Sequence, residues 1–170
     1  MGNVAPFQKE KLIMSILFNP KRADAKGIKD SLKTHWGEFS FESPVMPFHH
    51  TKYYENEMGS FLDRFFVCFL ALTEPDSLSE IKIRTTELEK ECFSSPDGNR
   101  YVNLDPGLLS PGKLILASTK NYSHRIPLKN GIYAEVTMMY EKKEWRDLPW
   151  TYPDYKTTEI RTILSQIRSL

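Results

Sequence analysis

Cysteine is scarce in this sequence, and so are the short motifs that mark common enzyme classes. The 2 cysteines, Cys68 and Cys92, form no CxxC pair, and we interpret them as buried thiols in a reducing compartment. No GxSxG, HExxH or GxGxxG motif occurs, so several enzyme classes have no support. His49 and His50 are adjacent, and neighbouring residues on an extended chain point in opposite directions. With no third ligand at a useful spacing, we expect no metal site there.

Net charge and long apolar runs are lacking as well. With 23 Lys and Arg against 22 Asp and Glu, the formal net charge is +1, which gives no broad electrostatic surface for nucleic acid or for a membrane. No apolar run reaches the length of a membrane span, and the N-terminus lacks the apolar core of a signal peptide. We therefore expect a cytoplasmic protein that binds neither nucleic acids nor membranes.

The composition that is present is typical of a globular domain. Hydrophobic residues make up 40% of the chain and aromatic residues 12%, which argues against disorder. A chain of 170 residues is one domain by default and buries most of the surface that its unfolded form exposes. We predict a single domain over residues 1–170, with the polar residues 1–10 as a flexible N-terminus.

Apolar periodicity predicts alternating strands and helices. Strand, helix, strand, strand, helix, strand is the order of a ferredoxin-like α+β sandwich. We therefore predict a mainly antiparallel sheet with helices packed on one face, plus an added β-hairpin and a C-terminal helix. The residues between 48 and 59 show no clear period and are interpreted as an ordered loop. The expected elements are strands at 11–18, 38–41, 62–72 and 100–104, and helices at 25–36, 78–92 and 160–167.

Three local motifs extend this prediction. Ser77 and Glu80 have the spacing of a capping box, which would begin the second helix. Asp105-Pro106-Gly107 is expected to turn the chain, and Ser110-Pro111 to begin a helix through the following GKLILAST. The segment 107–113 also matches the phosphate-loop pattern GxxxxGK, but Leu114 stands where a magnesium-binding Ser or Thr is needed. We therefore prefer a turn and an N-capped helix to a phosphate loop.

Apolar and polar residues alternate on both sides of Lys129-Asn130-Gly131, which predicts a β-hairpin over residues 123–137. A two-residue loop would pair Ile126 with Glu135 and mix apolar with charged side chains. A three-residue loop, with glycine in the left-handed position, pairs Ile126 with Ala134 and keeps the faces separate. We choose the three-residue loop, which also turns His124 toward the core.

The polar face of this hairpin is the main candidate site. Arg125 would lie opposite Glu135, and as an exposed cross-strand ion pair the contact would contribute about 0.2–1 kcal/mol. In the functional interpretation, Arg125, Lys113 and Lys120 bind an anion, while Glu135 and Asp105 orient water or a metal such as Mg²⁺. The polar face itself would carry Arg125, Tyr133, Glu135 and Thr137.

Residues outside the hairpin complete the candidate site. Asn103 lies close in sequence to Asp105. Tyr54 and Glu57 would form a pocket wall, although aromatic residues of this kind more often pack in the core. The aromatic segment 145–155 is either a clamp over the sheet or a lid whose Asp154 faces the ligand.

Six motifs spread along the chain carry a family resemblance. They are YYENEMG at 53–59, VNLDPG at 102–107, KL at 113–114, HRI at 124–126, GIYAEVT at 131–137 and LPWTYPDY at 148–155. In these motifs the chain resembles DUF4416, a family of bacterial proteins, over nearly its whole length. The resemblance implies no established activity, although some members are labelled GTP-binding.

Two functions from different classes follow from these residues. The first is a small-molecule-binding protein or small enzyme that acts on a phosphorylated or otherwise anionic metabolite, nucleotides included, at the polar hairpin face. The second is a non-catalytic interaction module whose exposed aromatic residues contact a protein partner.

Overall fold

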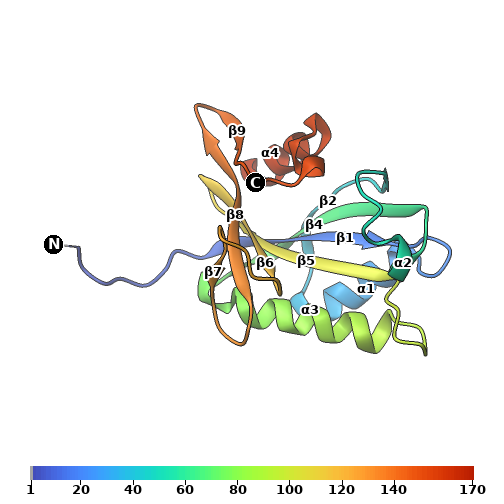
Figure 1. The fold of residues 1–170 in the computed structure, drawn as a ribbon. Coiled ribbons are helices and arrows are strands. Elements are labelled where there is room, and N and C mark those ends of the chain that lie inside the picture. The colour runs from blue at the N-terminus through green and yellow to red at the C-terminus, as the bar shows by residue number, and fades with distance from the viewer. Residues whose placement is uncertain (1) are drawn as a thin grey trace.

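The structure, a computed structural model, describes residues 2–170, which form a mixed α+β fold around a nine-stranded sheet (Figure 1). Its elements in chain order are β1 (Glu10–Phe18), α1 (Ala25–Trp36), β2 (Phe39–Glu42), β3 (Met46–Phe48), α2 (Glu55–Met58), β4 (Leu62–Thr73), the 3₁₀ helix η1 (Pro75–Ser77), α3 (Leu78–Cys92), β5 (Val102–Leu109), β6 (Lys113–Ser118), β7 (Ile126–Pro127), β8 (Tyr133–Glu141), β9 (Glu144–Asp147), the 3₁₀ helix η2 (Pro153–Lys156) and α4 (Thr158–Ser169).

The sheet is antiparallel at every pairing between these strands. Its order is β2-β4-β1-β5-β6-β8-β7, with β3 also paired to β4 and β9 to β8. The prediction of an α+β fold with a mainly antiparallel sheet is therefore confirmed. The segment 48–59, predicted as a loop, includes the end of β3 and the short helix α2.

Helices cover both faces of the sheet. Met14 and Ile16 of β1 pack in one core cluster with Ile28 of α1, whereas Ile13 packs in another with Leu164 of α4. Figure 1 shows α1 and α3 on one side of the sheet and α4 on the other. Because strand side chains alternate between faces, burial on both sides explains why β1 is a continuous apolar run. No helix within residues 2–170 is long and apolar enough to cross a membrane.

The predicted turn at 105–107 is wrong, because these residues lie inside β5. Pro106 pairs with Met14 of β1, but the second neighbour of β5, strand β6, pairs only from Gly107 to Leu109. Proline is tolerated where a strand has one neighbour, since its missing N–H is not needed on the open side. Pro106 therefore marks the point at which β5 and β6 separate.

The predicted helix after Ser110-Pro111 is also wrong, because Lys113–Ser118 is strand β6. Ser110 N–H donates to the Lys113 carbonyl at 3.0 Å, which closes a hairpin between β5 and β6. The backbone of the short apolar run that follows is hydrogen-bonded to two flanking strands, β5 and β8. The segment 107–113 is thus a strand and a hairpin turn, without the helix N-terminus that a phosphate loop needs.

Helix α3 is confirmed, but the predicted capping box at its start is absent. The Ser77 hydroxyl donates to the Glu74 carbonyl at 2.7 Å and caps no helical N–H. The backbone of Ser77 is helical, with φ −80° and ψ −4°, because Pro75 begins the 3₁₀ turn η1 just before it. An N-cap requires an extended backbone, so Ser77 lies outside the usual geometry.

The predicted three-residue loop of the hairpin is confirmed. Ile126 pairs with Ala134, and Gly131 has a φ of +77°. The predicted exposure of its faces is wrong: Glu135 is 1% exposed, whereas Ile126 is 64% exposed. The face with Glu135 is covered by the segment that follows β9, since the Thr151 hydroxyl donates to the Thr137 carbonyl at 2.6 Å.

The two cysteines differ in exposure. Cys68 of β4 is buried as predicted, but Cys92 is exposed. Cys92 is the last residue of α3 and is not among the buried residues of that helix. The prediction of two buried thiols is therefore correct only for Cys68.

Gly107 allows β5 and β6 to approach closely at the point where they separate. A Cβ atom at Gly107 would lie 2.6 Å from the Ile115 carbonyl oxygen and 2.7 Å from Leu116 Cδ2. We expect Gly107→Ala to lower the free energy of unfolding by about 1–3 kcal/mol, because backbone must move. Gly112→Ala is the matched control, since a Cβ there meets nothing within 4 Å. Urea unfolding of both variants checks this, and equal stabilities would contradict it.

Candidate functional site

A cavity of about 780 Å³ lies where β5 and β6 separate. We call it the β5–β6 cavity. Its volume is within the range of small-molecule sites, about 300–1,000 Å³. Its lining residues come from segments 48–54, 82–90, 100–105, 116–125 and 150–155, together with Arg64 and Glu135.

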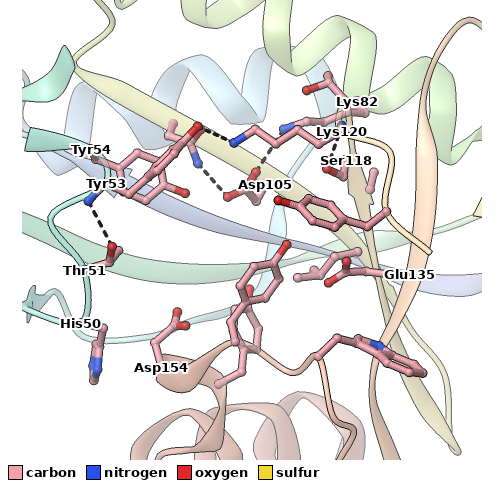
Figure 2. Close-up of a pocket in the computed structure, with 18 of the residues that line it drawn as sticks. His50, Thr51, Tyr53, Tyr54, Lys82, Asp105, Ser118, Lys120, Glu135 and Asp154 are labelled. Atoms are coloured by element: carbon pink, nitrogen blue, oxygen red, sulfur yellow. Dashed lines mark hydrogen bonds and ion pairs between the residues drawn. The ribbon is translucent and has the colours of Figure 1, made fainter. Parts of the chain in front are cut away.

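Asp105 lies at the centre of the cavity in a fixed set of hydrogen bonds (Figure 2). Lys82 Nζ lies 3.1 Å from Asp105 Oδ1 and also donates to the Leu104 carbonyl at 2.8 Å. Asn103 Nδ2 donates to the other carboxylate oxygen at 2.7 Å. Burial alone would raise the pKa of Asp105, but Lys82 and Asn103 outweigh it and hold the pKa below its usual value. Asp105 is therefore a carboxylate at neutral pH.

Arg125 connects three segments around Glu135. Its Nε donates to Glu135 Oε2 at 2.6 Å, and the two side chains are only 5% and 1% exposed. Its Nη1 donates to Ser118 Oγ and to the Lys120 carbonyl, both at 2.8 Å, and its Nη2 donates to the Tyr152 hydroxyl at 2.7 Å. The predicted pairing of Arg125 with Glu135 is present, but the pair is buried in the cavity wall instead of lying on an exposed face.

His124 also contacts Glu135, which contradicts its predicted position in the core. His124 Nε2 lies 3.1 Å from Glu135 Oε2. Strand β7 begins only at Ile126, so His124 lies in the preceding turn, where strand alternation does not apply. The imidazole is stacked on Trp150, with ring centres 4.9 Å apart and planes at 9°.

Tyr152 places a hydroxyl on the same wall. This hydroxyl accepts a hydrogen bond from Arg125 at 2.7 Å. Burial, with a smaller contribution from Glu135, raises the pKa of Tyr152 to about 12. The phenol is therefore protonated at neutral pH and has a proton to donate.

Asp154 forms a buried ion pair with Arg64 of β4. Both side chains are 9% exposed, and Arg64 Nε donates to Ser15 Oγ at 3.0 Å. Asp154 lines the cavity, which is the position predicted for it in a lid. Its carboxylate, however, is bonded to Arg64. This bond holds η2 against the sheet, as expected of a clamp. The guanidinium carbon lies 4.9, 5.2 and 5.3 Å from the ring centres of Phe48, Phe66 and Tyr155.

Arg100 anchors α2, the helix that follows the lining segment 48–54. It donates to Glu57 at 2.6 and 2.9 Å and to Glu89 of α3 at 2.6 Å. Arg100 holds the pKa of Glu57 below its usual value, whereas burial raises the pKa of Glu89. Glu89 also accepts the backbone N–H of Leu104 at 2.6 Å. Glu57, predicted to bind ligand, thus anchors α2 to the rest of the fold.

Lys120 forms a hydrogen bond with an uncharged side chain, that of Tyr53. Figure 2 shows its ammonium group pointing at the Tyr53 hydroxyl, with which it forms a hydrogen bond. The ammonium nitrogen also lies 4.2 Å from the Tyr53 ring centre. Tyr53 packs edge-on against Tyr54, with ring centres 5.1 Å apart. Within residues 2–170, no carboxylate forms an ion pair with Lys120.

Most of the predicted site residues share this cavity, although they come from distant segments. Those that line it are Tyr54, Asn103, Asp105, Lys120, Arg125, Glu135 and Asp154. Lys113 lies elsewhere, because it begins β6 and pairs with Met139 away from the cavity. The other predicted residues outside the lining are Glu57, Tyr133 and Thr137.

Several lining residues were not predicted as site residues from the sequence, among them Arg64, Lys82, His124 and Tyr152. Lys82 had a detectable signal. It is buried in α3 together with Glu89, at a seven-residue spacing beside the apolar stripe. Charged residues are rarely buried without a partner, so this spacing indicates two polar groups that face the protein interior.

Across residues 2–170, no three His, Cys, Asp or Glu side chains are grouped so that they could hold a metal ion. Asp105 and Glu135, the predicted residues for orienting a metal or water, are each bonded to a basic side chain instead.

Removing the carboxylate of Asp154 tests the buried ion pair. We expect Asp154→Asn to lower the free energy of unfolding by about 3–5 kcal/mol, because the Arg64 charge is left buried without a partner. Asp147→Asn, which breaks the more exposed pair with Arg161, should cost only about 0.2–1 kcal/mol. Denaturant unfolding measures both, and similar losses would show that burial of the Arg64 pair is unimportant.

Comparison with known proteins identifies the family. The family described as a domain of unknown function (DUF4416) matches residues 8–170. No curated protein matches the chain, and no solved structure matches it. The match covers nearly the whole length, so the chain belongs to the DUF4416 family.

Proposed function

We propose that this protein binds a small anionic molecule, carrying a phosphate or carboxylate group, in the β5–β6 cavity. The observation that carries this proposal is an excess of basic side chains in the lining. Six are basic and four are acidic. The basic residues are Arg64, Lys82, Lys90, Arg100, Lys120 and Arg125, and the acidic residues are Glu89, Asp105, Glu135 and Asp154.

Two lysines account for the excess of basic over acidic side chains. Each lining carboxylate is bonded to a lining cation, in the pairs Arg64–Asp154, Lys82–Asp105, Arg100–Glu89 and Arg125–Glu135. Lys90 and Lys120 remain, and no carboxylate within residues 2–170 forms an ion pair with either. Both lysines are exposed residues of the lining, so salt screens their charge more than that of the buried pairs, but no carboxylate neutralises it. An anionic group in the cavity would therefore be attracted to these two lysines.

The rest of the lining suits the non-ionic part of such a ligand. Tyr53, Tyr54, Tyr152 and Trp150 contribute flat apolar surfaces with hydrogen-bonding groups at their edges. Predominantly apolar and aromatic walls with a few fixed polar groups are typical of small-molecule sites. A nucleotide is one member of this ligand class, but it would bind without a phosphate loop, since residues 107–113 form a strand and a hairpin turn.

The ferredoxin-like description of the fold is likewise a proposal. It is supported by the strand order β2-β4-β1-β5. These are the four strands that the sequence predicts, and α1 connects β1 to β2 while α3 connects β4 to β5. In this description, β6 to β9 and α4 are additions. The cavity then lies between the common part and the added strands.

Anionic compounds should stabilise the protein, and Lys120 should contribute to the effect. Inorganic phosphate, pyrophosphate, citrate, AMP and GMP can be screened by thermal shift against adenosine and guanosine. We expect at least one anion to raise the melting temperature while the neutral nucleosides do not. Lys120→Gln should weaken its binding about tenfold, or about 1.4 kcal/mol, measured by calorimetry.

Lys113→Gln is the matched control, because Lys113 is an exposed lysine outside the cavity. Its affinity for the same anion should equal that of the unchanged protein. Equal weakening by both substitutions would indicate a nonspecific charge effect. If no anion shifted the melting temperature, the interaction-module alternative would be favoured.

A further inference from the structure

Glu135 and His124 form a carboxylate–histidine pair in the cavity wall. His124 Nε2 lies 3.1 Å from Glu135 Oε2, and Glu135 is 1% exposed. A carboxylate only accepts hydrogen bonds, so the shared proton belongs to His124 Nε2. Because Nε2 carries the proton in the neutral ring, the lone pair is on Nδ1. Glu135 therefore selects one tautomer of His124.

The Nδ1 atom of His124 has no hydrogen-bond partner within residues 2–170. It is also not among the buried polar atoms that lack a partner, which belong to Glu10, Ser79, Tyr155 and Arg161. Nδ1 therefore remains open to solvent. His124 lines the β5–β6 cavity, so a molecule bound there lies next to its ring.

Aromatic stacking holds the imidazole in place. Trp150 covers one side at 4.9 Å between ring centres, and the Tyr122 ring lies 5.9 Å away at 23°. Trp150 is itself fixed, because its Nε1 donates to the Val136 carbonyl at 2.8 Å. A ring fixed by stacking and by a buried carboxylate loses little freedom when it accepts a proton.

A hydrogen-bond donor lies next to this pair. The Tyr152 hydroxyl accepts from Arg125, which is bonded to the same Glu135 oxygen as His124. The Tyr152 hydroxyl is also hydrogen-bonded to Glu135, so Tyr152, Arg125 and His124 surround one carboxylate. One wall thus offers a proton acceptor, Nδ1 of His124, next to a carboxylate that three side chains hold in place.

We propose that His124 is a general base that activates water for attack on an ester of the anionic ligand, with Glu135 as its positioning residue. The water O–H bond breaks, its proton is bound by Nδ1, and its oxygen bonds to the carbonyl carbon or phosphorus. The bond to the leaving oxygen then breaks, and that oxygen takes the electron pair and a proton from His124. Water is the nucleophile because no side-chain hydroxyl or thiol within residues 2–170 is hydrogen-bonded to Nδ1.

This proposal rests on the proposed anion site and adds a reaction to it. Two chromogenic esters test it directly, p-nitrophenyl phosphate, which is anionic, and p-nitrophenyl acetate, which is neutral. We expect the protein to release p-nitrophenol from p-nitrophenyl phosphate faster than buffer does. His124→Asn should reduce that rate about 100-fold or more. His49→Asn, an exposed histidine outside the cavity, should leave it unchanged.

The tautomer of His124 tests whether Glu135 positions the ring proton, and the release rate measured beside it tests whether that position matters for the reaction. Long-range ¹H–¹⁵N spectra at pH 8 should show His124 protonated at Nε2 in the unchanged protein. Glu135→Gln should mix the two tautomers and lower the release rate, whereas circular dichroism should show that this variant is folded. A proton on Nδ1 in the unchanged protein, or a rate unaffected by His124→Asn, would overturn the proposal.

The outcomes for binding and for chemistry can be separated. If an anion shifts the melting temperature but neither ester is cleaved above the buffer rate, the anion site stands and the general base is rejected. If cleavage depends on His124 but no anion binds and only the acetate is cleaved, the base stands and the anionic ligand class is rejected. Thermal shift and ester release on the same samples distinguish these cases.

Discussion

The divergence of β5 and β6 is the feature on which the rest of the candidate site depends. The two strands pair over three residue pairs only, from Gly107 with Leu116 to Leu109 with Leu114. Beyond that point, β5 continues along β1 while β6 continues along β8. The two residues at the fork suit it, since Pro106 needs no second neighbour and Gly107 lets the backbones approach closely. The opening in the sheet becomes a cavity because helices and loops cover it.

Buried polar groups that line an opening in a sheet need partners, and here ion pairs satisfy the charged ones. Two of these pairs join segments far apart in sequence, Arg64 with Asp154 and Arg100 with Glu57. Desolvating a lone charge costs several kcal/mol, so these side chains are held in pairs as long as the chain is folded. The walls are therefore built before any ligand arrives, which reduces the free energy lost in ordering side chains on binding.

Much of the fold could be predicted from the sequence, because β1, β4, α1 and α3 have clear apolar periods. The hairpin register was also predictable, since only one loop length separates apolar from charged residues. The errors arise where two structures share one local pattern. Asp-Pro-Gly is usual in turns, and only the absence of a second neighbouring strand makes it acceptable within β5. Likewise, alternation shows that Glu135 and Ile126 lie on opposite faces, but not which face the following segment covers.

The site was harder to predict than the fold, because its contacts depend on where segments end. Arg125 and Glu135 could be paired from the hairpin register alone. His124 could not be placed, because it lies two residues before β7 begins and so escapes the alternation that placed its neighbours. Lys82 lies on helix α3, whereas its partner, Asp105, lies on strand β5. Such pairs follow from the sheet order, which no local pattern contains.

The difference between Lys120 and the other cavity cations indicates where a ligand can bind at least cost. Lys82 and Arg125 are held by Asp105 and Glu135, and moving either cation away from its carboxylate would break a buried ion pair. Lys120 donates to the hydroxyl of Tyr53, an exposed and uncharged group that water can solvate equally well. An anion would add the attraction between opposite charges, which the uncharged Tyr53 hydroxyl lacks. An anion can therefore replace Tyr53 at Lys120 with a net gain while every buried pair stays intact.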